Sequence, residues 1–222
     1  MIIVPTLLDE NIALLDEEVK RLSLFYPRFQ IDIADGVFVP HTTIQISDLT
    51  NLYTLAKPEI IFDFHLMVQD PLKQCEMIKN LHGITLGTVL IHKSVFPPLS
   101  ELVSNYPSLR FGLVLSPEDE VSTIDNEQII SLPALQIMTV VPGFQGSPFV
   151  EESLIKIEQL RKRGFTGEIL IDGSVNENTI PIILSKLYKP DVMGVGSYLT
   201  NSPREELERR EKRLKFLVEH VE

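Results

Sequence analysis

The sequence predicts a (β/α)8 barrel, and two observations support this fold class. Short, almost uninterrupted apolar segments recur at intervals of roughly 20–35 residues, and amphipathic stretches lie between them. Strands that are apolar throughout are typical of a parallel sheet that is covered on both faces. With eight such segments and no linker rich in Pro, Gly or Ser, we expect one barrel domain over residues 1–222. An open, doubly wound sheet is the alternative, but no Gly-x-Gly-x-x-Gly follows the first strand.

Each expected strand is a run of mostly apolar residues that is bounded by polar or turn-forming residues. They are Ile2–Pro5, Phe29–Ile33, Ile60–Leu66, Thr88–His92, Arg110–Leu115, Leu135–Val140, Glu168–Ile171 and Val192–Val195. The expected helices place apolar side chains three or four positions apart, on one face. They are Asp9–Ser23, Pro71–Leu81, Val150–Arg163, Asn176–Leu187 and Arg204–Val221. Helical periodicity is poor after Phe38, so we expect a long loop over Val37–Asp48.

Composition argues against several classes of function. The net charge of −11 disfavours a nucleic-acid surface, which needs clustered Lys and Arg. It also opposes a phosphorylated ligand, whose phosphate would need backbone N–H groups or helix N-termini close by. No apolar stretch approaches the roughly 18–20 residues needed to cross a bilayer. The first residues lack the basic region of a signal peptide, and the single cysteine, Cys75, is expected to be buried, so we predict a cytoplasmic location.

Side chains that can bind a metal end three of the expected strands. Asp32, His65 and Asp172 each close an apolar run, and the C-terminal ends of barrel strands form the active site. Two carboxylates and an imidazole can hold Zn²⁺ or a similar divalent ion. Two facing carboxylates can also act as base and acid on opposite sides of a substrate carbon. The alternative is that each carboxylate caps the following helix or ties down a loop.

Loops of small residues follow the sixth, seventh and eighth expected strands. Gly143 and Gly146 lie in the segment Val140–Gly146, which we interpret as an anion cradle or a plain turn. Gly173–Ser174 follows the seventh strand, and Gly196–Ser197 follows the eighth. Loops at these places are the usual phosphate site of barrel enzymes, so we predict a phosphate site here.

At these residues the chain resembles the ribulose-phosphate 3-epimerase family, nearly from end to end. The most specific part is Asp-x-x-Asp-Gly-x-Phe-Val-Pro at Asp32–Pro40, followed by Phe-His-Leu-Met at Phe64–Met67. The other matching segments, in family order, are Pro5–Leu8, Val140–Phe144, Ile171–Gly173 and Val195–Ser197. The resemblance implies a ribulose-phosphate-binding barrel that epimerises a ketopentose phosphate with the help of a divalent ion.

The resemblance also implies a role for each residue of the site. Asp32 would remove the C3 proton of the sugar, and Asp172 would return one from the other face. Both would bind a divalent ion (Zn, Fe, Mn or Co) together with His65, and that ion would hold the enediolate oxygens. The substrate and its phosphate would contact His65, Met67, Met138, Gly143, Phe144, Gln145, Gly146, Gly173, Ser174, Gly196 and Ser197. Met67 and Met138 could equally be core residues. The family further implies a homo-oligomer that binds a small sugar phosphate.

Several residues depart from the family's pattern. Gln30 stands where the family has a fourth metal ligand, a histidine. An amide oxygen is a poorer Zn²⁺ ligand than imidazole, so we expect metal affinity to fall or to shift toward a harder ion. His41 is a candidate substitute ligand, and a hydrogen-bonding role is expected for His92. Asp9 stands where a serine contacts the sugar phosphate in the family, and it adds a negative charge there.

Two more departures concern the phosphate cradle, and they keep three functions open. Gln145 and Ser174 replace glycines, and a side chain restricts φ at such positions. The chain is then an active epimerase, a paralogue that binds a sugar phosphate without epimerising it, or an enzyme of another class, such as an aldose–ketose isomerase or a phosphate-requiring lyase. Lyases of this superfamily use Asp-x-Lys-x-x-Asp, and Asp32–Asp35 contains no such lysine. We therefore expect an epimerase whose activity depends on the effect of Gln30 on the metal.

Overall fold

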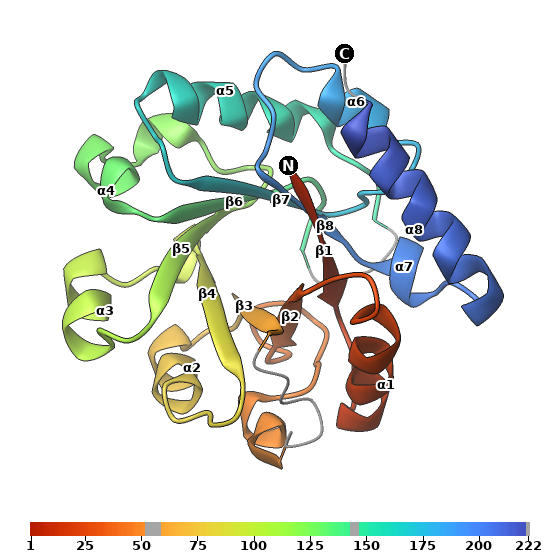
Figure 1. Ribbon diagram of the computed structural model, residues 1–222. Helices are drawn as coiled ribbons and strands as arrows, with labels where there is room; N and C mark the ends of the chain where they lie inside the picture. The colour runs from red at the N-terminus through yellow and green to blue at the C-terminus, as the bar shows by residue number, and fades with distance from the viewer. Residues whose placement is uncertain (52–58, 143–146, 221–222) are drawn as a thin grey trace.

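Eight parallel strands close into a barrel (Figure 1). The computed structural model describes residues 1–51, 59–142 and 147–220. The strands are β1 (Ile2–Leu7), β2 (Arg28–Ala34), β3 (Ile61–Met67), β4 (Thr85–His92), β5 (Arg110–Leu115), β6 (Ala134–Met138), β7 (Glu168–Asp172) and β8 (Val192–Val195). β8 pairs with β1 from Ile2↔Val192 to Pro5↔Val195. This pairing confirms the predicted barrel and excludes the open sheet.

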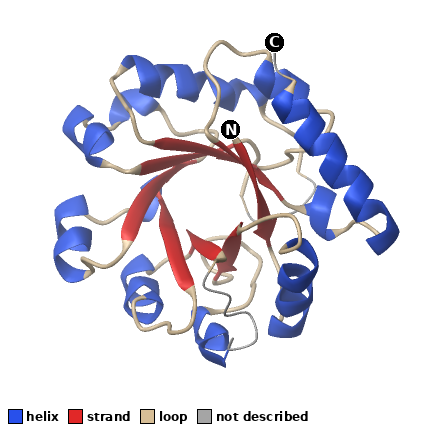
Figure 2. Ribbon diagram, in the orientation of Figure 1, coloured by secondary structure: helices blue, strands red, loops and turns tan. Residues whose placement is uncertain are grey.

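Helices surround the barrel on its outside (Figure 2). The α-helices are α1 (Ile12–Leu22), α2 (Pro71–Ile78), α3 (Leu99–Asn105), α4 (Asn126–Ser131), α5 (Ile155–Lys162), α6 (Ile180–Leu184), α7 (Ser197–Thr200) and α8 (Arg204–Glu219). The short 3-10 helices are η1 (Ile46–Asn51), η2 (Lys93–Val95), η3 (Val121–Thr123) and η4 (Glu151–Leu154). Within the described residues, none of the helices has the length and apolar character that crossing a membrane would require.

The expected helices form, although most are shorter than their apolar periodicity suggests. α1 starts after Asn11, whose side chain accepts a hydrogen bond from the N–H of Leu14 at 3.1 Å. Such a cap satisfies an N–H that the first helical turn leaves without a partner. The stretch Val150–Arg163 is divided into η4 and α5 rather than forming one helix. Cys75 is fully buried in α2, as predicted.

The expected long loop after β2 is present, and Asp35 holds its start. Within the described residues, no α-helix lies between β2 and β3. Asp35 Oδ1 accepts hydrogen bonds from the N–H groups of Val37 and Phe38, both at 2.8 Å. Its Oδ2 accepts from the N–H of Gln69 at 2.7 Å. Burial favours the neutral acid, but these backbone bonds outweigh it and lower the pKa of Asp35. This aspartate of the family motif is therefore a structural residue.

Alternation along the strands divides the buried apolar side chains into two sets. One set packs between the strands and the helices and includes Phe29, Phe62, Phe64 and Phe111. The other set fills the barrel interior and consists of Val4, Leu90, Val114, Ala134, Met138, Val140, Leu170 and Val192. Burial of one phenylalanine stabilises the fold by roughly 1.5–3 kcal/mol. The outer set is the larger of the two and fixes the strands that position the polar groups inside the barrel.

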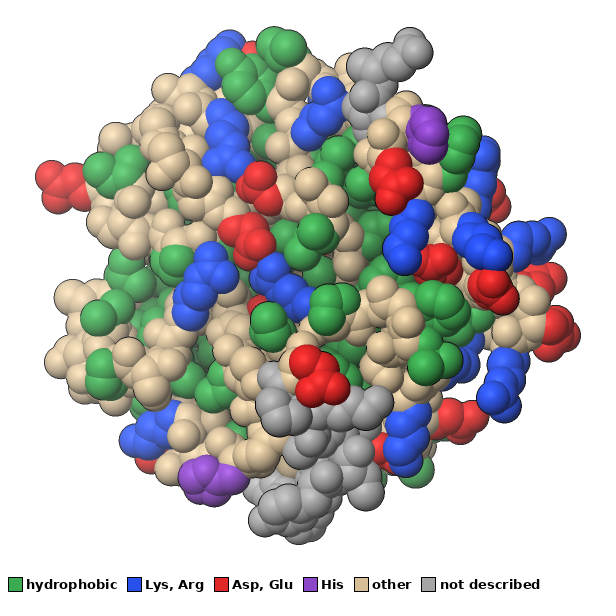
Figure 3. All heavy atoms as spheres, in the orientation of Figure 1, with side chains coloured by type: hydrophobic (Ala, Val, Ile, Leu, Met, Phe, Trp, Pro, Cys, Tyr) green, Lys and Arg blue, Asp and Glu red, His purple; other side chains and the backbone are tan. Residues whose placement is uncertain are grey.

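Charged residues close the N-terminal end of the barrel. Arg28 donates from Nε to Asp63 at 2.6 Å, and from its two terminal nitrogens to the carboxylate of Glu168 at 2.8 and 2.9 Å. Arg110 lies 3.7 Å from the same carboxylate. Asp63 Oδ1 also accepts from the N–H of Thr88 at 2.7 Å. Figure 3 shows acidic and basic side chains next to each other over the centre of the barrel on the face drawn. The carboxylates at this end are thus matched by arginines.

Candidate active site

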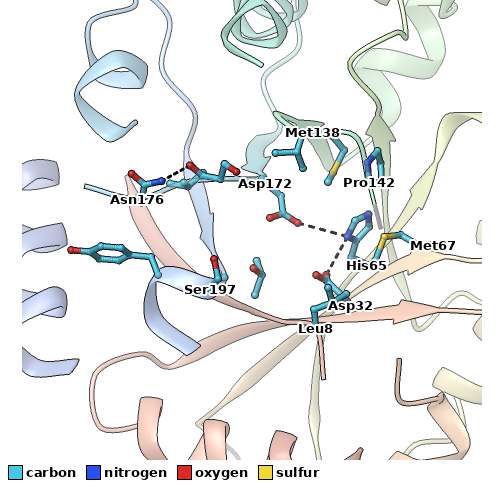
Figure 4. Close-up of a pocket in the computed structure, with 16 residues that line it drawn as sticks. Leu8, Asp32, His65, Met67, Met138, Pro142, Asp172, Asn176 and Ser197 are labelled. Atoms are coloured by element: carbon cyan, nitrogen blue, oxygen red, sulfur yellow. Dashed lines mark hydrogen bonds and ion pairs between the residues drawn. The ribbon is translucent and has the colours of Figure 1, made fainter. Parts of the chain in front are cut away.

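Three predicted strand-end side chains converge at the C-terminal end of the barrel. Asp32 lies on β2, His65 on β3 and Asp172 at the end of β7. All three are buried, and one ligating atom of each lies within 4.8 Å of the other two. Asp32 and Asp172 extend toward each other, with His65 beside them (Figure 4). The structure therefore brings together the residues that the sequence suggested as a shared site.

Gln30 contacts both carboxylates of this cluster. It precedes Asp32 by two residues, so both side chains point to the inner face of the barrel. Its Nε2 donates to Asp32 Oδ1 at 2.9 Å and to Asp172 Oδ2 at 2.7 Å. The side chain is 2% exposed. The departure from the family's pattern at this position thus places an amide donor between the two acids.

Two histidines extend the cluster away from the carboxylates. His65 Nδ1 lies 3.1 Å from Asp32 Oδ1 and 3.7 Å from Asp172 Oδ2. The Nε2 atoms of His65 and His92 are 2.9 Å apart. The ring of Phe38, from the loop after β2, lies 4.8 Å from the ring of His92. The hydrogen-bonding role predicted for His92 is confirmed, and the loop that Asp35 holds covers this histidine pair.

Burial and neighbouring charges shift the pKa values of the cluster. Burial raises the pKa of Asp172 to about 6, the charge of Asp32 adds to this effect, and His65 and the amide of Gln30 oppose it. Burial disfavours protonated His65, but the hydrogen bond to Asp32 and the charges of both aspartates outweigh it, so the pKa of His65 is raised. Burial and the proximity of His65 hold the pKa of His92 well below its usual value. The cluster therefore contains a carboxyl group whose pKa is raised toward neutral pH, as suits a general acid.

The carboxylates line a cavity of about 310 Å³, at the lower end of the usual range for small-molecule sites. Met67 and Met138 line it, as do Gly173–Ser174 and Gly196–Ser197. None of the described residues around the cavity is Lys or Arg. A phosphate bound here would therefore depend on backbone N–H and hydroxyl groups, as the acidic composition led us to expect.

The backbone after β7 is unusual at two adjacent residues. Gly173 has a φ of 118°, and a Cβ atom there would lie 2.5 Å from Cγ2 of Val140. Ser174 has a φ of 52° and is the single non-glycine residue with positive φ in the described chain. Its hydroxyl donates to the carbonyl of Ser147, and its carbonyl accepts from Nδ2 of Asn176 at 2.9 Å. Because a side chain disfavours this conformation, the serine that replaces a family glycine leaves a strained backbone beside the cavity.

Other predicted residues either fall outside the described residues or are absent from the described lining of the cavity. The segment Gly143–Gly146, with Phe144 and Gln145, lies outside the described residues. Asp9 follows β1 and is partly buried, but it is not among the residues that line the cavity. Burial, together with Glu18 and Asp32, raises the pKa of Asp9 to about 6. Among the described residues, His41 is not part of the metal-capable cluster.

Gln136 is a part of the site that sequence reasoning missed. It lies on β6, is fully buried, and its Nε2 is 3.5 Å from both Asp172 Oδ2 and Met138 Sδ. Its Oε1 has no hydrogen-bond partner among the described residues. A signal was present, because Gln136 is a polar residue inside the apolar run Leu135–Val140, two positions before Met138 and hence on the same face.

The chain was compared with protein families, curated proteins and solved structures. A model of the ribulose-phosphate 3 epimerase family matches residues 2–199. The ribulose-phosphate 3-epimerase of Schizosaccharomyces pombe is 30% identical over 209 residues, which cover 91% of this chain and 89% of that protein. The ribulose-phosphate 3-epimerase of Escherichia coli (strain K12) is 28% identical over 215 residues, which cover 91% and 90%.

Solved structures that resemble this one share its barrel. Orotidine 5'-phosphate decarboxylase from Pyrococcus horikoshii OT3 aligns over 97% of this chain and 99% of its own, with a TM-score of 0.62 at 14% identity. The tryptophan synthase alpha chain from Legionella pneumophila aligns over 99% and 91%, with a TM-score of 0.63 at 12% identity. At these identities the structural likeness supports the fold and carries no information about the reaction.

Proposed function

The chain belongs to the ribulose-phosphate 3-epimerase family, and from that premise we propose that it epimerises a ketopentose phosphate, or a related ketose phosphate, at C3. One observation carries the proposal. Two buried carboxylates, Asp32 on β2 and Asp172 on β7, extend toward each other and line one cavity of about 310 Å³. Inversion of a carbon centre by proton removal and return requires a base on one face and an acid on the other.

In this proposal Asp32 takes the C3 proton, and Asp172 delivers a proton to the opposite face. In the metal-free protein, burial and the charge of Asp32 raise the pKa of Asp172, which is the direction that a proton donor needs. His65 Nδ1 lies 3.1 Å from Asp32 Oδ1, within hydrogen-bond distance of the proposed base. The reverse reaction uses the same residues with the roles of base and acid exchanged.

The donor set fits the divalent ion that the family implies. Asp32, His65 and Asp172 would hold it, with two carboxylate oxygens and one imidazole nitrogen within 4.8 Å of one another. Such a set suits Zn²⁺, Fe²⁺, Mn²⁺ or Co²⁺. When bound, the ion would supply positive charge for the oxygen on which negative charge develops as C3 loses its proton. Gln30 donates through its Nε2 to both of these carboxylates.

The proposal extends to the phosphate, the sugar, the assembly and the cellular location. The loops Gly173–Ser174 and Gly196–Ser197 would receive the phosphate, since both line the cavity. Met67 and Met138 would contact the sugar. The whole chain would act as one domain in a homo-oligomer, in the cytoplasm, where the lone buried Cys75 would stay reduced.

The exchange of C3 hydrogen with solvent tests this function directly. We expect the protein, incubated in D₂O with ribulose 5-phosphate and Zn²⁺, Mn²⁺ or Fe²⁺, to incorporate deuterium at C3. Asp32→Asn and Asp172→Asn should each reduce the rate by about 10³-fold or more, because each removes one partner of the proton relay. Asp70→Asn is the matched control, since Asn caps α2 as well as Asp does and should leave the rate unchanged.

A paralogue that binds a sugar phosphate without epimerising it is the second candidate, and the amide between the two acids favours it. In that case ribulose 5-phosphate would raise the unfolding temperature, yet no deuterium would enter C3 with any of these metals. That pair of results would overturn the epimerase proposal.

A further inference from the structure

The side-chain amide of Gln30 lies between the two carboxylates of the site and contacts both. Its single side-chain nitrogen makes one short hydrogen bond to Asp32 and one to Asp172. These acids lie on β2 and β7, which are not neighbours in the barrel. The amide therefore links two separate strands at the C-terminal end of the barrel, which we call the barrel mouth. Because Gln30 is 2% exposed, solvent cannot easily replace these bonds.

The chemistry of the carboxamide allows two arrangements that exclude each other. A carboxylate only accepts hydrogen bonds, and the amide NH₂ has two protons to donate, so the nitrogen must face the two acids when it bridges them. A divalent cation between the same acids would be repelled by the NH₂ group and would coordinate the carbonyl oxygen instead. To pass from one arrangement to the other, the amide group must therefore rotate by about 180° about the Cγ–Cδ bond of Gln30.

We propose that Gln30 is a built-in competitor of the divalent ion: its NH₂ group bridges Asp32 and Asp172 in the metal-free protein, and metal loading requires it to turn its carbonyl oxygen inward. The inference rests on the proposed function, because it concerns the ion of that same site. A bridge of this kind keeps the mouth ordered without metal. It also weakens metal binding, since the ion must displace two charge-assisted hydrogen bonds.

Gln136 provides the matched comparison within the same site. It is also a buried amide, and it also approaches Asp172 Oδ2, but at 3.5 Å and without contact to Asp32. An amide that bridges both acids should govern metal binding, whereas an amide at the edge of one acid should not. The pair Gln30→Leu and Gln136→Leu separates the bridge from the general loss of a buried polar group.

The first experiment uses metal-free protein and needs no substrate. In EDTA we expect Gln30→Leu to unfold at least about 5 °C below the wild type, because two facing carboxylates lose their common donor. Gln136→Leu should shift the midpoint by less than half as much, since one polar atom of that amide already lacks a partner. Equal midpoints for wild type and Gln30→Leu would overturn the proposal.

The second experiment measures metal affinity by calorimetric titration with Zn²⁺, and Gln30→His covers the case in which Gln30→Leu does not fold. Imidazole offers a ligand nitrogen and no NH₂ bridge. We therefore expect Gln30→His to bind Zn²⁺ at least about tenfold more tightly than the wild type. Gln136→Leu should change the affinity for Zn²⁺ by less than Gln30→His does, because its amide approaches only one of the two acids. Equal affinities for the wild type and Gln30→His would also overturn the proposal.

A spectroscopic readout follows the amide itself. The side-chain NH₂ signals of Gln30, assigned by their loss in Gln30→His, should shift when Zn²⁺ is added to the wild type, because their two carboxylate acceptors are lost. Signals that do not move at saturating Zn²⁺ would contradict the turning of the amide. These three measurements are independent of catalysis, so they can succeed even if no deuterium enters C3 of ribulose 5-phosphate.

Discussion

Strand β7 carries a carboxylate at each end, and the surroundings of the two carboxylates shift their pKa values in opposite directions. At the N-terminal end, Glu168 accepts a bidentate pair of hydrogen bonds from Arg28 and lies 3.7 Å from Arg110. Burial would raise its pKa, but the two arginines outweigh burial and lower it. At the C-terminal end, Asp172 faces another carboxylate, and its described neighbours supply two amides, an imidazole and the backbone of Gly173 but no arginine or lysine. Its pKa is raised instead.

This difference indicates that the N-terminal end of the barrel contributes to stability and that the C-terminal end carries the candidate active site. At the N-terminal end the arginines compensate the charge of Glu168, while burial still raises the pKa of Asp63 in spite of Arg28. At the C-terminal end no described Lys or Arg lining the cavity balances the negative charges of Asp32 and Asp172. This arrangement lowers stability, but it leaves the two carboxyl groups available for proton transfer and for binding a cation. Ser174, whose backbone is strained, belongs to this same end. Four variants test the contrast, and two of them are paired with a second variant for comparison.

The largest effect on stability is expected for Arg28→Met. Arg28 donates hydrogen bonds to both Asp63 and Glu168, so its loss leaves two carboxylates without their main partner. We expect the unfolding free energy, measured by urea denaturation, to fall by about 3–5 kcal/mol. Arg209→Met is the control, since the Arg209 side chain is 77% exposed in its pair with Glu206 and should change stability by less than about 1 kcal/mol. Equal effects of the two variants would show that the N-terminal ion pairs do not stabilise the barrel.

Glu168→Gln should have a smaller effect of the same sign. At pH 7 we expect a loss of about 1–3 kcal/mol, because Gln cannot form the bidentate charged pair with Arg28. The pKa of Glu168 is lowered from its usual 4.5, so its contribution is present above that pH and disappears as the pH falls through the folded-state value. The difference between variant and wild type should therefore vanish in acid. A difference that persists unchanged at pH 3 would contradict the electrostatic explanation.

The smallest effect is expected at the strained residue of the mouth. Ser174→Gly should raise the unfolding free energy by about 0.5–1 kcal/mol, because glycine adopts positive φ without steric penalty, even though one hydroxyl hydrogen bond is lost. Gly173→Ala, one residue earlier, should instead destabilise, since its Cβ would collide with Val140. Thermal unfolding of both variants checks the pair. A destabilising Ser174→Gly would indicate that the backbone there is not strained.

Much of the fold could be predicted from the sequence, because apolar runs and their spacing define parallel strands with little ambiguity. The strand boundaries were less certain. β1 continues past Pro5 to Leu7, because Thr6 and Leu7 pair with Gln30 and Ile31. A proline inside a strand lacks an N–H, and only the register of its neighbours decides whether the strand goes on.

The site could be predicted only in part. The positions of Asp32, His65 and Asp172 at strand ends made their convergence foreseeable once a barrel was inferred. The bridge from Gln30 to Asp172 could not be foreseen, because it joins residues 142 positions apart and depends on the direction of one side-chain amide. The sequence marked Gln30 as a weak metal ligand, and the structure adds that it is a hydrogen-bond donor to both acids.

The pH dependence of stability for the wild type and Asp172→Asn tests the contrast between the two ends most directly. The pKa of Asp172 is about 6 in the folded protein against its usual 3.8, so the folded state binds this proton more tightly than the unfolded chain does. Its ionisation therefore lowers the unfolding free energy of the metal-free protein as the pH rises from about 4 through 6. We predict that in EDTA the advantage of Asp172→Asn over the wild type grows from a small value at pH 4 to about 1–3 kcal/mol at pH 7. Parallel profiles, or a variant less stable than the wild type at pH 7, would contradict the account.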